Sequence, residues 1–141
     1  MVAVAAEHHS DEVLDFWFPY DGFWESRETF AKWMHHRMQG GVDERICRHF
    51  AGLTTAAARG LLDDWADTPR GRLALLIVLD QFPRSLWRGT PGAYAQDCKA
   101  TRLALEGIGN GHFKAAKPWE KIFYAIALAS GPMALNDSEP M

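Results

Sequence analysis

In residues 10–39, apolar side chains recur at helical spacing. Ser10 is placed to cap a first helix, which has an acidic first turn and runs until Pro19. A second helix is predicted from about Ser26 to Gln39, where two glycines follow. Four apolar residues lie on one side of this second helix: Phe30, Trp33, Met34 and Met38.

A third helix is predicted to begin near Asp43. Three of its side chains are expected to face inward: Ile46, Cys47 and Phe50. The small residues around Thr54 to Arg59 either extend this helix or start another turn before Gly60. The sequence thus predicts helix throughout this region, with its boundaries left open.

The central helix is predicted from an apolar run, LALLIVL, at residues 73–79. Thr68 followed by Pro69 is a typical cap and first turn. The helix is expected to end at about Phe82, because Pro83 has no N–H for the carbonyl four residues before it. Seven apolar residues in a row predict burial on every side of this helix.

Two further helices follow in the sequence. The first is predicted from Thr90 and Pro91 to the glycines at 107 and 109. Its residues at helical spacing are Tyr94, Cys98, Thr101 and Leu105. Pro118 starts the second, which ends before Gly131. Its apolar residues at helical spacing are Trp119, Ile122, Phe123 and Ile126.

The fold class predicted from these elements is all-α. No segment alternates apolar and polar residues strictly between hairpin turns, so a sheet has no support. Short turns between the helices favour antiparallel helical hairpins, packed as a bundle or a short solenoid-like array. A chain of 141 residues suits one core, which we assign to residues 11–131. Residues 1–10 and 132–141 are expected to be flexible tails.

Charge and cysteine usage narrow the classes of partner. The net charge is −3 and basic residues are spread along the chain, so nucleic acid and acidic membrane surfaces are disfavoured. No stretch is long and apolar enough to span a bilayer, and no secretory leader is recognisable, so we expect a cytoplasmic protein without a membrane partner. Cys47 and Cys98 are expected to be reduced and mostly buried, because their spacing fits neither a redox pair nor a zinc site.

We expect neither a metal ion nor a cofactor. The six histidines lack the spacing of metal ligands. The chain has no phosphate-binding loop, no dinucleotide glycine pattern and no nucleophile elbow, so ordinary nucleotide chemistry is unsupported.

The polar residues that follow the apolar run are the first candidates for function. Asp80, Gln81 and Arg84 come directly after it, and such groups cost several kcal/mol each if they lose water without a partner. They must therefore pair with one another or serve a ligand. Asp80 shares the stripe of the apolar residues three, four and seven positions before it, and Arg84 has the spacing of a helical ion pair. Three more cations are candidate partners of Asp80: Arg72, Arg88 and Lys99.

Our first hypothesis is a pocket for a small molecule at the end of the central helix. Asp80 and Asp97 are the candidate catalytic acid or base, and arginine side chains would hold an anionic group of the ligand. Asp97 lies between Tyr94 and Thr101, which can form hydrogen bonds on the same helix face. The candidate ligand-binding residues are Trp33, Gln81, Arg84, Trp87 and Arg88.

Two other interpretations of the same residues stay open. In the second hypothesis, helical hairpins present a concave groove to a peptide or a partner protein. In the third, Asp80 and Arg84 form a buried latch that ties the helix end to the next loop, and Gln81 satisfies backbone carbonyls.

Several motifs resemble an uncharacterised bacterial family called domain of unknown function 924. They are FWFP near the start, Trp33, the run LALLIVLDQFPRSLWRGTPGAYAQD and the later PWEKIF. The resemblance extends from Val13 to about Leu128. It implies a helical fold similar to tetratricopeptide repeats and no established reaction.

One departure from this family pattern concerns the end of the chain. Members usually continue after the PWEKIF helix through a motif rich in His, Ser and Glu, whereas this chain reads ALASGPMALNDSEPM. Either this is a short or truncated member, or its final helix is lost by another route, and those polar groups are absent in both cases. A missing final helix would leave apolar surface around Ile122 and Ile126 uncovered, which predicts either association with another chain, such as self-association through that surface, or poor stability.

Overall fold

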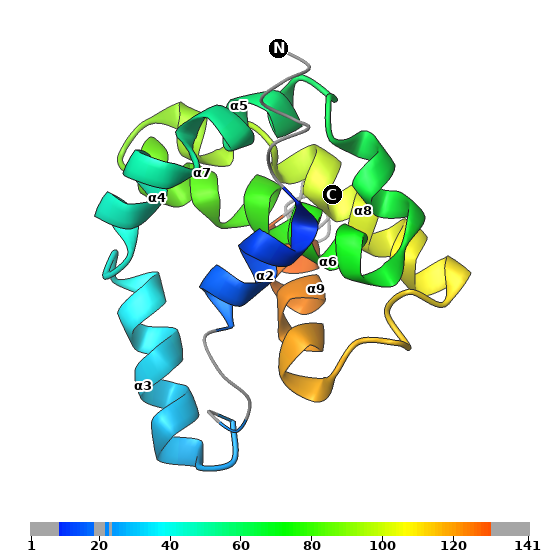
Figure 1. Cartoon of the computed structure of the whole chain (residues 1–141), viewed down its shortest axis with the longest axis horizontal. Coiled ribbons are helices and arrows are strands. Elements are labelled where there is room, and N and C mark those ends of the chain that lie inside the picture. The colour runs from blue at the N-terminus through cyan, green and yellow to red at the C-terminus, as the bar shows by residue number, and fades with distance from the viewer. Residues whose placement is uncertain (1–8, 19–21, 23, 131–141) are drawn as a thin grey trace, which may run out of the picture.

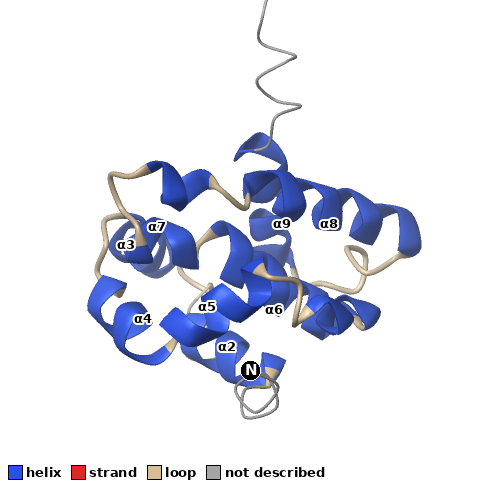
Figure 2. Ribbon diagram, turned by 90° about the horizontal axis from the view of Figure 1, so that it is seen from above, coloured by secondary structure: helices blue, strands red, loops and turns tan. Residues whose placement is uncertain are grey.

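The structure, a computed structural model, describes residues 9–18, 22 and 24–130. Every regular element within these ranges is a helix (Figures 1 and 2). The predicted all-α fold class is therefore confirmed. The predicted tails, apart from residues 9 and 10, lie outside the described residues.

The first helix, α2, spans Ser10–Trp17. The predicted cap is wrong by one residue: His9 occupies the N-cap position in extended conformation, and Ser10 is already helical. Glu12 N–H donates to the carbonyl of His9 at 3.0 Å, so the first turn closes one residue earlier than expected. The helix ends at Trp17, and Pro19 lies outside the described residues.

The next helix, α3, spans Arg27–Met38 and lies at one edge of the molecule (Figure 1). Its predicted start is confirmed, because the Ser26 hydroxyl accepts a hydrogen bond from Thr29 N–H at 3.3 Å. Trp33 is its buried residue, whereas the other three apolar positions are half-buried. This helix therefore joins the core mainly through one indole.

Two short helices follow, α4 at Asp43–His49 and α5 at Ala51–Ala58. Ile46 and Phe50 are buried as predicted. The expected burial of Cys47 is wrong, because it lies one position beyond Ile46 around the helix and is exposed. Cys98 is also exposed, so the expectation of mostly buried thiols fails for both cysteines.

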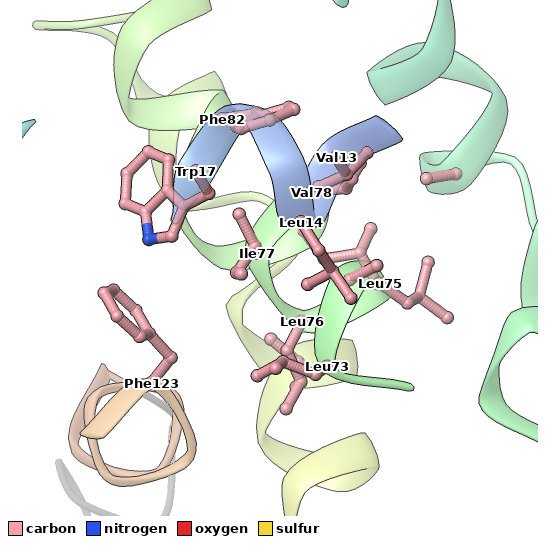
Figure 3. Close-up of a cluster of buried hydrophobic side chains, with 14 of the residues drawn as sticks. Val13, Leu14, Trp17, Leu73, Leu75, Leu76, Ile77, Val78, Phe82 and Phe123 are labelled. Carbon is pink, nitrogen blue, oxygen red and sulfur yellow. The ribbon is translucent and has the colours of Figure 1, made fainter. Parts of the chain in front are cut away.

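The central helix, α6, spans Pro69–Asp80, and every residue from 71 to 80 is buried. Thr68 caps it as predicted, since its hydroxyl accepts a hydrogen bond from Gly71 N–H at 3.0 Å. α6 packs against α2, α5, α8 (Asp97–Asn110) and α9 (Pro118–Ser130), and also against the short helices η1 (Asp63–Asp67) and α7 (Phe82–Leu86). Figure 3 shows its apolar side chains beside Val13 and Leu14 of α2.

The last two helices are α8, at Asp97–Asn110, and α9, at Pro118–Ser130. The predicted start of α8 is wrong, because the Thr90–Pro91 signal opens only the short 3-10 helix η2 (Pro91–Tyr94). Gly107 and Gly109 lie inside α8, which ends at Asn110 and is capped by Gly111 with φ +93°. A Cβ at residue 107 would lie 2.8 Å from Arg72 Cδ and from the Tyr124 ring, so close helix packing explains that glycine.

Aromatic rings join the two ends of the chain. Trp17 of α2 contacts Phe123 of α9 in an edge-to-face arrangement, with ring centroids 5.7 Å apart. Figure 3 shows the two rings directed toward one another. Trp17 also contacts Phe82 of α7 and Trp33 of α3, at 6.2 and 6.3 Å. The core is thus continuous from α2 and α3 through α7 to α9.

The tetratricopeptide-like arrangement is not confirmed. α6 contacts helices from both ends of the chain, whereas each unit of a repeat array packs only against its neighbours. Within the described ranges, no helix is both long and apolar enough to cross a membrane.

We expect the Leu76→Ala variant to be strongly destabilised, because Leu76 is buried in α6 and its removal leaves a cavity among packed helices. The free energy of unfolding should fall by about 2–5 kcal/mol. Urea unfolding followed by circular dichroism measures it. Leu105→Ala on α8 is the matched control: its side chain is exposed, and it should change stability by less than about 0.5 kcal/mol. Equal losses in both variants would contradict the central position of α6.

Candidate functional site

The site predicted from the sequence lies where α6 ends and α7 begins. Gln81 N–H donates to the carbonyl of Ile77 at 2.9 Å, which closes the last turn of α6. Pro83 then interrupts the helical pattern, and Arg84 N–H donates to the carbonyl of Gln81 at 3.1 Å. The break between α6 and α7 leaves Asp80 and Arg84 within ion-pair distance, 3.8 Å between Oδ1 and the nearer Nη.

Asp97, at the start of α8, is the strongest partner of Arg84. The guanidinium binds both carboxylate oxygens of Asp97, at 2.7 and 3.3 Å. One of its Nη groups also donates to the carbonyl of Ala93 at 2.7 Å. Arg84 therefore connects α7, η2 and α8, and we call the group of Asp80, Gln81, Arg84 and Asp97 the Asp–Arg cluster.

Asp80 is the most buried member of this cluster. Its side chain is 2% exposed. Its Oδ2 accepts a hydrogen bond from the Gln81 amide at 2.7 Å, whereas Oδ1 has no hydrogen-bond partner among the residues that the structure describes. A buried carboxylate oxygen without a donor is costly, and its only compensation within the described residues is the nearby charge of Arg84.

The surroundings of Asp80 raise the pKa of its carboxyl group above the ordinary value of 3.8. Burial is the main cause, because it disfavours the charged form. The charge of Arg84 and the hydrogen bond from Gln81 act in the opposite direction, and the charge of Asp97 adds to the effect of burial. The carboxyl therefore keeps its proton to a higher pH than a solvated aspartic acid does.

Trp87 and Arg88, predicted as ligand-binding residues, do not join the cluster. Arg88 forms an ion pair with Asp43 of α4, with nitrogen–oxygen distances of 2.7 and 3.0 Å. Trp87 is partly exposed and lies against Gly92. No hydrogen bond, ion pair or ring contact between Trp87 and the cluster occurs within the described part of the chain.

Trp33 also lies elsewhere, in the aromatic core. Its indole N–H donates to the carbonyl of Trp17 at 3.3 Å. Its ring contacts Phe123, with centroids 6.0 Å apart. Two other candidate partners, Lys99 and Arg72, do not pair with Asp80. Lys99 binds Asp63 at 2.6 Å, and Arg72 lies near the other end of α6.

Tyr94 is a member of the site that the sequence analysis did not assign. Its ring lies under the guanidinium of Arg84, with 4.7 Å from Cζ to the ring centroid. Tyr94 is 60% exposed, so this contact lies at the surface. The predicted hydrogen bond between Asp97 and Thr101 does not form, because Thr101 donates to the carbonyl of Ala127 at 2.8 Å. The sequence predicts a long helix from Thr90 and Pro91, and that prediction gives no sign that Tyr94 lies against Arg84.

A second buried polar group lies near the start of α6. Arg72 donates to His112 Nδ1, at 2.9 Å, and to the carbonyls of Leu103 and Ala66. Glu120, in the first turn of α9, accepts from Arg70 and from Lys117 N–H, which suits an acidic side chain at a helix start. Among the residues that the structure describes, no three or more His, Cys, Asp or Glu side chains are grouped to hold a metal ion.

The sequence profile of a bacterial protein family of unknown function, DUF924, matches residues 13–131. The chain belongs to this family. This confirms the resemblance drawn from the DQFPR and RGTP motifs. The matched range contains every residue of the Asp–Arg cluster, so the cluster is part of the DUF924 domain itself.

A solved structure from Agrobacterium tumefaciens, the protein of unknown function ATU0120, is similar to this DUF924 chain. The two are 30% identical, with a TM-score of 0.67. The similarity covers 84% of this chain and 61% of that protein, so this chain spans less than two thirds of its length. No curated protein matches the chain.

The apolar surface of α9 that we expected to be uncovered is partly covered. Ile122 and Ile126 are both half-buried. Residues 131–141 lie outside the described residues, and self-association through this surface stays a prediction.

The pH dependence of stability should reveal the raised pKa of Asp80. Between pH 3.8 and its pKa in the folded protein, Asp80 binds more protons in the folded chain than in the unfolded one. Its contribution to stability is therefore present at low pH and lost as the pH rises through this window. As the pH increases through this window, the free energy of unfolding of the wild type should decrease relative to that of Asp80→Asn. Urea unfolding at several pH values measures both.

Asp43→Asn is the matched control, because its pKa is shifted in the other direction. Burial opposes ionisation of Asp43, but hydrogen bonds from Arg88 and Ser85 and the charge of Arg88 outweigh it and lower the pKa. Its contribution is present above pH 3.8 and lost as the pH falls. The stability of the wild type relative to Asp43→Asn should therefore rise with pH. If the stability difference between the wild type and each variant changed with pH in the same direction for both variants, the raised pKa of Asp80 would be refuted.

Proposed function

We propose that this DUF924 chain binds a small polar molecule at the Asp–Arg cluster and that Asp80 is the residue that contacts it. The observation that carries the proposal is the buried Oδ1 of Asp80, which has no hydrogen-bond partner among the described residues. Nearly all buried polar atoms in proteins have a partner, so an exception calls for an explanation such as a catalytic role or a bound molecule. Trp17 Nε1 and the Tyr124 hydroxyl also lack a partner there, but both are neutral groups, whereas Asp80 is a carboxyl group beside Arg84. A ligand N–H or O–H group would supply the missing donor.

Arg84 would position Asp80 in this proposal, and Asp97 would hold Arg84. The guanidinium already contacts both oxygens of Asp97 and the carbonyl of Ala93. An anionic ligand group, as first hypothesised from the sequence, would have to displace Asp97 from these contacts. A neutral or cationic donor could reach Asp80 without breaking them, and we therefore favour that class of ligand.

The route from solvent to Asp80 would pass Arg84 and Tyr94. The side chain of Arg84 is 24% exposed and contacts both Asp80 and the exposed ring of Tyr94. Rotation of these two side chains would open the site. The raised pKa of Asp80 suits proton transfer with a bound ligand, because a useful acid or base titrates closer to neutral pH than a free carboxyl group does.

The proposal can be tested by thermal unfolding with three small probes that share a size but differ in chemistry: ethanolamine, acetamide and acetate. We expect ethanolamine or acetamide to raise the unfolding temperature of the wild type in a saturable way, because both offer N–H donors. The acceptor acetate serves as the contrast. Asp80→Asn should lose the response, and Asp43→Asn, which alters an exposed ion pair, should keep it.

The outcome that contradicts binding is a wild type that responds to no donor probe, or an Asp80→Asn variant that responds as the wild type does. The first result would favour the latch hypothesis, in which Asp80 and Arg84, 3.8 Å apart, form a buried pair that ties the end of α6 to the segment after it. The bidentate pair of Arg84 and Asp97 would then join α7 to α8 and bind no ligand. A tetratricopeptide-like scaffold for a partner protein stays a prediction.

A further inference from the structure

The contact between Arg72 and His112 allows only one protonation state of the imidazole. Arg72 lies on α6, and 6% of its side chain is exposed. Its Nε donates to Nδ1 of His112, in the connection between α8 and α9, at 2.9 Å. Because a guanidinium only donates hydrogen bonds, Nδ1 has to offer its lone pair. The imidazole in this contact is therefore neutral and has its proton on Nε2.

Arg72 is held in place on the other side of the guanidinium. Its Nη groups contact the carbonyls of Ala66 and Leu103, at 3.0 and 2.9 Å. One of them also lies 3.5 Å from the carboxylate of Glu106. These contacts tie Arg72 to η1 and α8. A proton on His112 would therefore place a second positive charge against a guanidinium that is already fixed.

The segment that contains His112 has fewer ties to the core. Residues 111–117 connect α8 and α9 without helical structure, at the edge of the molecule (Figure 1). His112 is half-buried, and its backbone N–H donates to the Asn110 side chain at 3.0 Å. Phe113 N–H donates to the carbonyl of Gly107 at 3.0 Å. Release of this segment would break the hydrogen bond to Arg72 and leave the packing of α6 against the other helices in place.

Tyr124 of α9 lowers the cost of releasing the segment. Its hydroxyl is buried and has no hydrogen-bond partner among the described residues. The ring of Phe113 lies against the ring of Tyr124, with centroids 5.2 Å apart. If the segment moves away, water can reach the hydroxyl and supply the missing partner. This gain offsets part of the hydrogen bond that Arg72 loses.

Titratable or charged groups lie on every element around His112. They are Arg72 of α6, Glu106 of α8, Tyr124 of α9, Asp67 of η1 and Lys114 of the segment itself. Burial and the charge of Arg72 lower the pKa of His112 below its ordinary value of 6.5, and the charge of Asp67 opposes them without outweighing them. Burial raises the pKa of Tyr124 above 10.0, so its hydroxyl stays neutral while His112 titrates. Glu106 is 53% exposed and contacts Arg72, which leaves His112 as the titrating group of this contact.

We propose that His112 is a pH-sensitive switch whose protonation releases residues 111–117 from Arg72 and α6. Above pH 6.5 the imidazole is neutral in both forms, and the hydrogen bond from Arg72 keeps the segment closed. Below pH 6.5 the open form binds a proton that the closed form excludes. The closed form is therefore lost as the pH falls, by up to about tenfold in the opening equilibrium for each pH unit.

This switch is separate from the Asp–Arg cluster. Arg72 lies near the start of α6 and Asp80 at its end, about 12 Å apart along the helix axis. The two sites also respond to pH in opposite directions. Acid pH favours the folded chain through Asp80, whose pKa is raised, but opens the segment through His112, whose pKa is lowered. Failure of either proposal therefore leaves the other intact.

The test is amide hydrogen exchange of the full chain between pH 5 and pH 8. Protection factors are compared, because they correct for the pH dependence of the chemical exchange step. The reporting amides are those of Phe113 and Ala116, which donate to the carbonyls of Gly107 and Phe113. We expect their protection to be constant above pH 6.5 and to fall below it, by up to about tenfold for each pH unit.

His112→Gln is the variant that isolates the switch. The glutamine side chain can accept a hydrogen bond from Arg72 but does not titrate, so the loss of protection at acid pH should disappear. His49→Gln, which alters an exposed histidine of α4, should keep the loss seen in the wild type. The proposal is overturned if the wild type has the same protection at pH 5 and pH 8, or if His112→Gln loses protection as His49→Gln does.

An NMR titration of the His112 ring protons checks the same claim without a substitution. The imidazole should titrate below pH 6.5, and the protection of Phe113 should stop falling once the imidazole of the closed form is protonated. An imidazole that titrates at or above pH 6.5 would also overturn the proposal.

Discussion

The burial of α6 on all sides is the constraint on which the rest of the structure depends. A helix that is apolar all round has to be covered by other elements, and α2, α5, α8 and α9 do this from different directions. Polar groups at its ends cannot reach water and have to find partners on the covering helices. The position of every polar cluster next to α6 follows from this requirement.

The two ends of α6 meet the requirement differently. Near the start, Arg72 is surrounded by acceptors, namely two backbone carbonyls, His112 and Glu106. Near the end, Arg84 is bound by Asp97, whereas Asp80 keeps one oxygen without a donor. The buried Tyr124 hydroxyl near Arg72 also lacks a hydrogen-bond partner among the described residues, but it is a neutral group. Leaving a carboxylate oxygen without a donor costs more than leaving a hydroxyl without one, and this is the reason to place a ligand at the end of the helix. The family and the similar solved structure do not reveal an activity, so this asymmetry is the main indication of function.

The sequence predicted most of what local rules control. The helix start at Ser26, the cap at Thr68, the burial of residues 73–79 and the spacing of Asp80 and Arg84 follow from local pattern and from helix-start signals. Gln81, expected in the latch hypothesis to satisfy backbone carbonyls, donates instead to Asp80. The start of α8 was predicted too early, because the Thr90–Pro91 signal is the same for a long helix and for the short turn that forms there. The prediction that Cys47 is buried is wrong, because on a short helix the apolar content alone does not show which of two adjacent residues faces the core.

Contacts between distant segments could not be read from the sequence. The ring of Tyr94 under Arg84 depends on the turn at η2. The ion pair of Arg88 with Asp43, 45 residues apart, removed a predicted ligand-binding residue from the site. The placement of Arg37 between two indoles depends on how α3 returns to the end of α2. Pattern and spacing contain no information on these long-range contacts, because such contacts are set by the packing of whole helices.

Native-state hydrogen exchange tests the central position of α6 most directly. If the other helices depend on α6, its amides at residues 73–79 should exchange only through global unfolding and should be the most protected in the chain. The amides of α3, which lies at the edge and joins the core mainly through Trp33, should exchange faster through local opening. Exchange of residues 73–79 at the rate of α3, at a free energy below that of global unfolding, would contradict the account.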